Sequence, residues 1–152
     1  MRFILCFVIF GLWLLMGACV FGKGELDIDI GDYEYHLEAW NNQNMLDYQI
    51  EVIYMGSNRK TQTLITVKNN IPESNDSSYW LEENRKSTIP EFYSLIKSYE
   101  KIFRDAHNSG DNRLLSLKVS YNTKYHYPTS IISKVNGSTT QHFIISLKPL
   151  GE

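Results

Sequence analysis

Apolar side chains recur with a helical period in two segments of the chain. In residues 32–45 three of them share one helical face: Tyr33, Leu37 and Trp40. The second segment, residues 88–107, opens with Thr88-Ile89-Pro90-Glu91, which matches a capping box with proline in the first turn. Its apolar stripe continues to Ala106. The pattern therefore predicts two amphipathic helices.

Five other segments alternate apolar and polar residues, which is the period of a half-buried strand. They are residues 47–56, 61–69, 113–121, 129–135 and 139–147. In the last segment we expect Phe143, Ile145 and Leu147 to share one face, and Asn136-Gly137 before it is a strong hairpin signal. Segregated runs of strands and helices favour an α+β fold. We expect an antiparallel sheet of about five strands with two helices packed on one face, in the order α-β-β-α-β-β-β.

The N-terminus has the pattern of a secretion signal. Arg2 precedes an apolar run over residues 3–16, and two small residues then lead to Cys19. The run is shorter than the roughly 20 residues that span a bilayer. The block that begins at Met16 and ends at Cys19 resembles a bacterial lipobox, in which the cysteine is acylated before the signal is removed. We expect a signal peptide over residues 1–18 and lipidation of Cys19, rather than a secreted protein with an incidental thiol.

Lipid attachment would decide where the protein resides. Several acyl chains on one N-terminus anchor a protein lastingly, and Val20 stands where a retention signal has aspartate. The resemblance therefore implies a bacterial envelope lipoprotein, located at the outer membrane rather than the inner one. We expect residues 19–31, which are acidic and rich in glycine, to form a lipidated tether, and residues 32–152 to form a single domain.

Charge narrows the classes of partner. The chain has 17 acidic and 15 basic residues and a formal net charge of −2, which is unlike the balance of a nucleic-acid-binding protein. We therefore expect no nucleic acid among its partners. The expected partners are the membrane, through the lipid, and a protein or another component of the envelope.

A calcium loop is the most tempting metal site in the sequence. Asp27 and Asp29 fall at loop positions 1 and 3, and Glu38 falls at position 12. However, Gly31 offers no side-chain ligand at position 5, and Asp32 stands at position 6, where the loop needs glycine. A solvated tether followed by a helix cap explains these acids better.

The sequence signals for other metal sites and for catalytic sites are equally weak. The four histidines lack the spacings that zinc sites favour, although folding could still bring two of them together: His36, His107, His126 and His142. There is no Gly-x-Ser-x-Gly motif, and no cysteine is available as a nucleophile once Cys19 carries lipid. The sequence predicts no catalytic residue, no metal ligand set and no cofactor, so we expect a protein that is not an enzyme.

Two stretches resemble a known family of small bacterial secreted and lipoprotein domains of unknown function. They are LEAWNNQNMLDYQIEV, which starts at Leu37, and VSYNTKYHYPTSI, which starts at Val119. The family pairs a tryptophan-containing first helix with a late motif, Tyr-Asp, two residues, Tyr-Gly-Tyr-Pro. The matching residues here are Tyr121, Asn122, Tyr125, His126, Tyr127 and Pro128. Asn122 replaces the usual aspartate, and His126 replaces the usual glycine. The resemblance implies a fold and an envelope location, and no activity.

Aromatic residues in predicted loops form a candidate binding patch: Trp80, Tyr125, His126 and Tyr127. The Tyr-His-Tyr-Pro turn could instead close one end of the sheet, which we favour because proline fixes a turn. The leading hypothesis is a non-enzymatic envelope lipoprotein that recognises a partner. One alternative is an inhibitor of a secreted hydrolase that presents the loop from Asn69 to Trp80. A second is an enzyme whose site is assembled around His126 with Asn122 and Tyr125.

Overall fold

The computed structural model describes residues 24–56, 60–74 and 87–151. In chain order the described elements are β1 (Leu26–Asp29), α2 (Tyr33–Asn42), β2 (Tyr48–Met55), β3 (Lys60–Lys68), β4 (Ile71–Ser74), α3 (Ile89–Asn108), β5 (Leu115–Tyr121), β6 (Pro128–Val135) and β7 (Ser138–Pro149). Neither of these two helices is long and apolar enough to cross a membrane.

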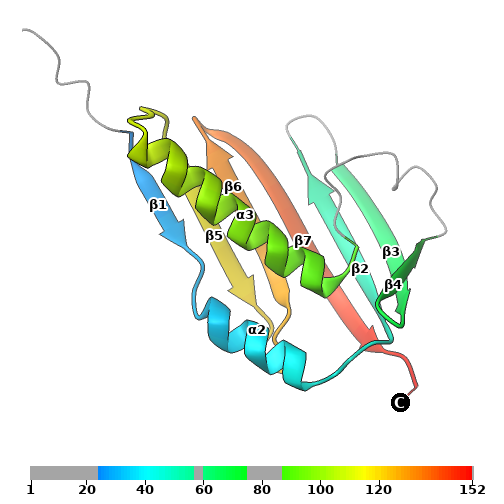
Figure 1. The fold of residues 1–152 in the computed structure, drawn as a ribbon. Helices are drawn as coiled ribbons and strands as arrows, with labels where there is room; N and C mark the ends of the chain where they lie inside the picture. Colours follow the sequence, from blue (N-terminus) through cyan, green and yellow to red (C-terminus); the bar gives the residue numbers. More distant parts are fainter. Residues whose placement is uncertain (1–23, 57–59, 75–86, 152) are drawn as a thin grey trace, which may run out of the picture.

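All seven described strands join in one sheet, in the order β1-β5-β6-β7-β2-β3-β4. The pairing of β1 with β5 is parallel, and every other pairing is antiparallel. Both helices lie on the same face of the sheet, and α2 lies beside the turn that joins β5 to β6 (Figure 1). We call the opposite face, which no described helix covers, the free face.

The core lies between the sheet and the helices. Tyr48, Ile50 and Val52 alternate along β2 and are all buried, as the strand period predicts. Helix α3 contributes an apolar stripe to the same core: Ile89, Phe92, Tyr93, Ile96 and Phe103. Because Ile65 is buried and the neighbouring Leu64 is 54 % exposed, the same alternation separates the two faces of β3.

Helix α3 begins as the sequence predicts. The Thr88 hydroxyl accepts a hydrogen bond from the Glu91 backbone N–H at 3.4 Å, and the Glu91 carboxylate accepts one from the Thr88 N–H at 3.1 Å. The capping box is therefore confirmed. A tertiary contact completes the cap, because the hydroxyl of Tyr48 accepts the backbone N–H of Ile89 at 3.0 Å. Burial raises the pKa of Tyr48 to about 12.

The expectation of a five-stranded antiparallel sheet is wrong, because the sheet has seven strands and is mixed. One extra strand, β1, lies inside the segment expected to be a tether, and its alternating Leu-Asp-Ile-Asp sequence pairs in parallel with β5. The other, β4, lies in the expected loop after β3. Asn69 and Asn70, with φ of 51° and 61°, form the tight turn that leads into it. Short edge strands bury little apolar area, so their periodicity is weak.

The expectation that Phe143, Ile145 and Leu147 share one face of β7 is also wrong. The pairing of β2 with β7 shifts, so that Glu51 pairs with Ser146 and Val52 with Ile144, which leaves Ile145 as an extra residue. A bulge of this kind reverses the alternation of side chains. His142 and Ile144 are consequently buried, at 3 % exposure each, whereas Ile145 is 50 % exposed.

Candidate functional site

The turn between β5 and β6 holds most of the residues that the sequence singled out, and its own hydrogen bonds fix its shape. The side-chain oxygen of Asn122 accepts the backbone N–H groups of Lys124 and Tyr125, at 2.9 and 2.7 Å. The Asn122 N–H donates to the carbonyl of Tyr127, and the His126 N–H donates to the carbonyl of Asn122. Asn122 is therefore engaged in holding the turn closed.

The candidate binding patch of the sequence is divided by the structure. Tyr127 is 5 % exposed and belongs to the core. Tyr125 and His126 are half-buried, and the side chain of Gln43, just after α2, donates to the Tyr125 carbonyl at 3.0 Å. Trp80 and the lipidation candidate Cys19 lie outside the described residues. Of the four patch residues, Tyr125 and His126 are thus placed together at a surface.

His126 meets a second histidine there. The Nδ1 atom of His126 lies 3.1 Å from the Nδ1 atom of His36, which belongs to the first turn of α2. The two rings have centroids 5.2 Å apart and are tilted by 46°. A hydrogen bond between the two Nδ1 atoms requires one of them to carry a proton and the other to be unprotonated. Folding therefore brings together two histidines that are 90 positions apart in the chain.

Aromatic rings surround this pair and hold it in place. His36 stacks on Tyr121, with centroids 4.2 Å apart and ring planes 8° from parallel, and the Tyr121 hydroxyl donates to the Ile30 carbonyl. His126 has the ring of Tyr35 edge-on at 5.4 Å. The backbone carbonyl of His126 accepts a hydrogen bond from the hydroxyl of Tyr93 on α3. Both imidazoles are consequently oriented by neighbours from several elements.

The electrostatics of the cluster favour neutral side chains. Burial lowers the pKa of His36 below its ordinary value of 6.5; the nearby His126 lowers it further, while Asp32 raises it. Burial raises the pKa of Tyr93 and the pKa of Tyr121. The neighbouring Tyr33 raises both pKa values further. These hydroxyls therefore keep their protons at neutral pH and act as hydrogen-bond donors.

A hollow of about 440 Å³ lies on the helix-covered side, beside α3 and the strands β2 and β7. It is lined by eight residues: Tyr54, Ser94, Leu95, Ser98, Tyr99, Ile102, Thr140 and His142. The hydroxyls of Ser94 and Ser98 donate to carbonyls one turn earlier in their own helix, which does not activate them as nucleophiles. Among the described residues that line this hollow there is no carboxylate.

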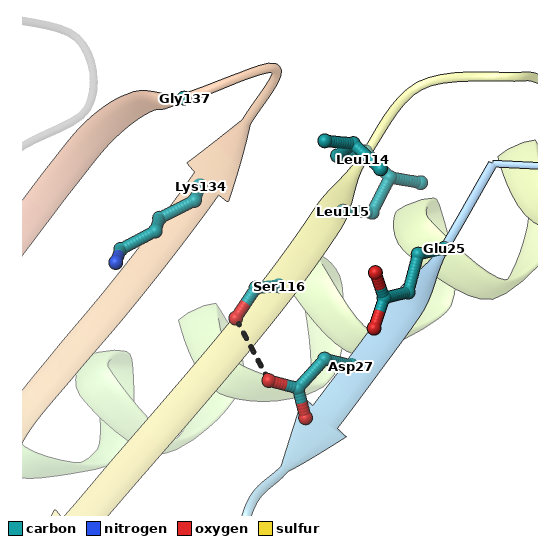
Figure 2. A pocket seen from close by; sticks show the side chains of 7 residues that line it. All are labelled: Glu25, Asp27, Leu114, Leu115, Ser116, Lys134 and Gly137. Carbon is teal, nitrogen blue, oxygen red and sulfur yellow. Dashed lines mark hydrogen bonds between the residues drawn. The ribbon is translucent and has the colours of Figure 1, made fainter.

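A shallower hollow of about 260 Å³ lies on the free face, where β1, β5 and β6 run side by side. Figure 2 shows Glu25, Asp27, Ser116 and Lys134 projecting from this side of the sheet, away from the helix. Asp27 accepts a long hydrogen bond from Ser116 at 3.5 Å and forms an ion pair with Lys118 at 3.3 Å. Charges of both signs therefore line this end of the free face.

Apolar residues continue across the free face from that charged end. Strand register places Phe143 of β7 opposite Ile53 of β2. On the other side of β7, Ile132 of β6 is opposite Gln141, which lies two positions before Phe143. These three apolar side chains are half-buried. Leu64 of β3, opposite Glu51 in the register, extends the row and is 54 % exposed. The free face is thus charged at one end and apolar across its middle.

The calcium loop considered in the sequence does not assemble. Asp27 points into the hollow on the free face, Asp29 accepts the backbone N–H of Gly31 at 3.2 Å, and Asp32 precedes the first residue of α2. Among the described residues there is no group of three or more histidine, cysteine, aspartate or glutamate side chains that could hold a metal ion.

In the described part of the chain, the fold is a seven-stranded mixed sheet with both helices on one face. Residues 32–139 of the chain match a family of unknown function, DUF6174. Because the match spans most of the chain, the protein belongs to this family. No curated protein and no solved structure matches the chain.

The sequence pattern pointed to Tyr125 and His126 in the turn between β5 and β6, but it did not connect His36 with this turn. His36 is 90 positions away from His126, and no periodic spacing relates them. The other notable feature of His126 is conformational, because its backbone φ is +59°. Residues other than glycine uncommonly adopt this left-handed backbone conformation, and where they do, a functional role is worth considering. Only the docking of α2 beside the β5–β6 turn identified its partner.

Proposed function

We propose that the protein is a non-enzymatic binding module of the bacterial envelope, anchored by lipid at Cys19, and that it recognises a folded protein partner with its free face. The observation that carries the proposal is the one-sided cover of the sheet. Both described helices pack on one face, while the other presents an apolar row beside charged groups. Apolar side chains bordered by polar ones are typical of interaction surfaces.

The composition of the free face favours protein over the other classes of envelope component. Glu25 and Asp27 at the β1 edge lie beside Lys118 and Lys134 on the neighbouring strands, and this mixture of signs suits the mixed charges of a protein surface. A polyanion would be repelled by the acidic groups and by the net charge of −2. The apolar row through Phe143 supplies the desolvated centre that protein interfaces need.

The two alternative functions have less support. The enzyme hypothesis needs Asn122, Tyr125 and His126 to converge on a cleft, but neither hollow described above is lined by any of them. The inhibitor hypothesis relies on the loop from Asn69 to Trp80. Asn69 and Asn70 form a hairpin turn, β4 follows, and the rest of the loop lies outside the described residues.

Site-specific photocrosslinking of the full chain in its native cell tests the proposal. A benzophenone side chain is placed at Leu64 on the free face or, as the matched control, at Ile102 on α3, which is 58 % exposed. We expect an adduct of defined mass from position 64 and none from position 102. Adding Lys134→Glu to the variant with benzophenone at position 64 should weaken that adduct several-fold, because the substitution reverses an exposed charge beside the apolar row.

Two outcomes would contradict the proposal. Equal adducts from both positions would indicate non-specific proximity rather than recognition by the free face. The absence of any adduct at position 64 in cells that make the protein at its normal level would exclude a stable protein partner on this face.

A further inference from the structure

The His36–His126 pair has the spacing of two ligands on one metal ion. Their Nδ1 atoms are 3.1 Å apart. Two imidazole nitrogens bonded to one ion at about 2.0–2.1 Å lie about 2.9 Å apart at a right angle and about 3.4 Å apart at the tetrahedral angle. The observed separation falls between these limits. A metal ion could therefore bridge the two nitrogens with a movement of a few tenths of an ångström.

The pair is also prepared for ligation before any ion arrives. A ligating imidazole must be neutral, and the hydrogen bond between the two Nδ1 atoms requires at least one of them to be unprotonated. The stack on Tyr121 and the edge of Tyr35 fix the two ring planes. Neighbours that orient ligating histidines are characteristic of metal sites. The Asp32 side chain, one turn before His36, makes no capping hydrogen bond and adds negative charge nearby.

The backbone at His126 supplies an independent reason to look for a role. Its φ of +59° is strained for a residue with a Cβ, and glycine would adopt it at little cost. The strained residue is the one whose imidazole faces His36. Strain that persists at a surface turn is often associated with function.

We propose that His36 and His126 bind one divalent ion of the late first-row transition series, such as Zn²⁺, Ni²⁺ or Cu²⁺, through their Nδ1 atoms. Imidazole nitrogen suits these ions, whereas Ca²⁺ and Mg²⁺ prefer oxygen. The two histidines fill two coordination positions, and water or a donor group from a bound partner fills the others. The site lies where α2 meets the β5–β6 turn (Figure 1), apart from the free face, and does not depend on the function proposed above.

Calorimetric titration of the full chain in detergent, purified without a histidine tag, tests the site with Zn²⁺ and with Ni²⁺. We expect one ion per chain in the unaltered protein and affinity reduced at least about tenfold in His36→Gln and in His126→Gly. The matched control is His107→Gln on α3, which removes a histidine outside the pair and should leave binding unchanged. Any cysteine thiol in the purified protein is common to all variants and cancels in the comparison.

Histidine nitrogen NMR of the unaltered protein supplies a second readout that needs no substitution. We expect the Nδ1 resonances of His36 and His126 to shift together on addition of Zn²⁺ and to remain in place with Ca²⁺. No binding of either transition-metal ion at about 1 mM, where a site with a dissociation constant well below that concentration is saturated, would overturn the proposal. Unchanged affinity in His126→Gly, or a Zn²⁺ shift at other histidines only, would also overturn it.

Discussion

The hydroxyl of Tyr48 links the sheet to the start of α3, and its removal gives a sharp test of the fold. Tyr48 is fully buried, and its hydroxyl is the acceptor for the backbone N–H of Ile89, the first residue of the helix. In Tyr48→Phe that N–H keeps its buried position and loses its partner. The aromatic ring and its edge contact with Trp40, with centroids 5.6 Å apart, are retained. The substitution therefore isolates one hydrogen bond.

The expected loss follows from the burial of the donor. An unsatisfied buried N–H costs about 1–3 kcal/mol, and the retained ring keeps the cavity term small. We therefore expect the free energy of unfolding to fall by about 2 kcal/mol in Tyr48→Phe. The matched control is Tyr35→Phe, because Tyr35 is 61 % exposed and surface substitutions usually change stability by less than about 0.5 kcal/mol.

Urea unfolding followed by circular dichroism measures the difference. We expect the midpoint of Tyr48→Phe to fall by about 1 M with an unchanged slope, whereas that of Tyr35→Phe should move little. A loss below about 0.5 kcal/mol in Tyr48→Phe would refute the reasoning. It would mean that the Ile89 N–H finds another acceptor, and that α3 does not depend on the sheet for its cap.

Two further predictions concern the anchor and the histidine pair. Cys19→Ala should move the protein from the membrane fraction to the soluble fraction, because it removes the proposed site of acylation; unchanged sedimentation would contradict lipid attachment. Because His36 binds a proton less readily in the folded than in the unfolded chain, stability should fall as the pH decreases below about 6.5. His126, Asp32, Tyr35 and Tyr121 are the groups that face His36. Urea midpoints at about pH 7.5 and about pH 5.5 should therefore differ less in His36→Gln, and an identical difference would assign the effect to other groups.

Elements with many buried apolar residues were predictable from the sequence. The two helices, the alternation of β2, β3 and β5, and the Asn136-Gly137 hairpin all appear where the periods place them. Each of these elements buries several side chains, so its period is repeated often enough to be recognised. Strands β1 and β4 have four residues each, and the single extra residue Ile145 reversed the face of β7. Signals of that length are too short to separate from turns and tethers.

The candidate site was also predictable from the sequence only in part. The sequence singled out the turn that contains Tyr125 and His126, because large aromatic residues there are hard to explain as core. It also assigned Tyr127 to the same patch, although Tyr127 is buried. Whether a turn residue faces water or the core depends on which helix docks against the turn, and that choice is not encoded within the turn itself.

Local interactions between neighbouring residues control the helical and strand periods, the capping box at Thr88 and the left-handed turn at Asn136-Gly137, so the sequence alone predicts these features. Three features became visible only in the folded chain: the parallel pairing of β1 with β5, the packing of both described helices on one face of the sheet, and the contact of His36 with His126. These features join segments that are far apart in the chain. Their energies come from contacts formed after collapse, which no window of neighbouring residues contains.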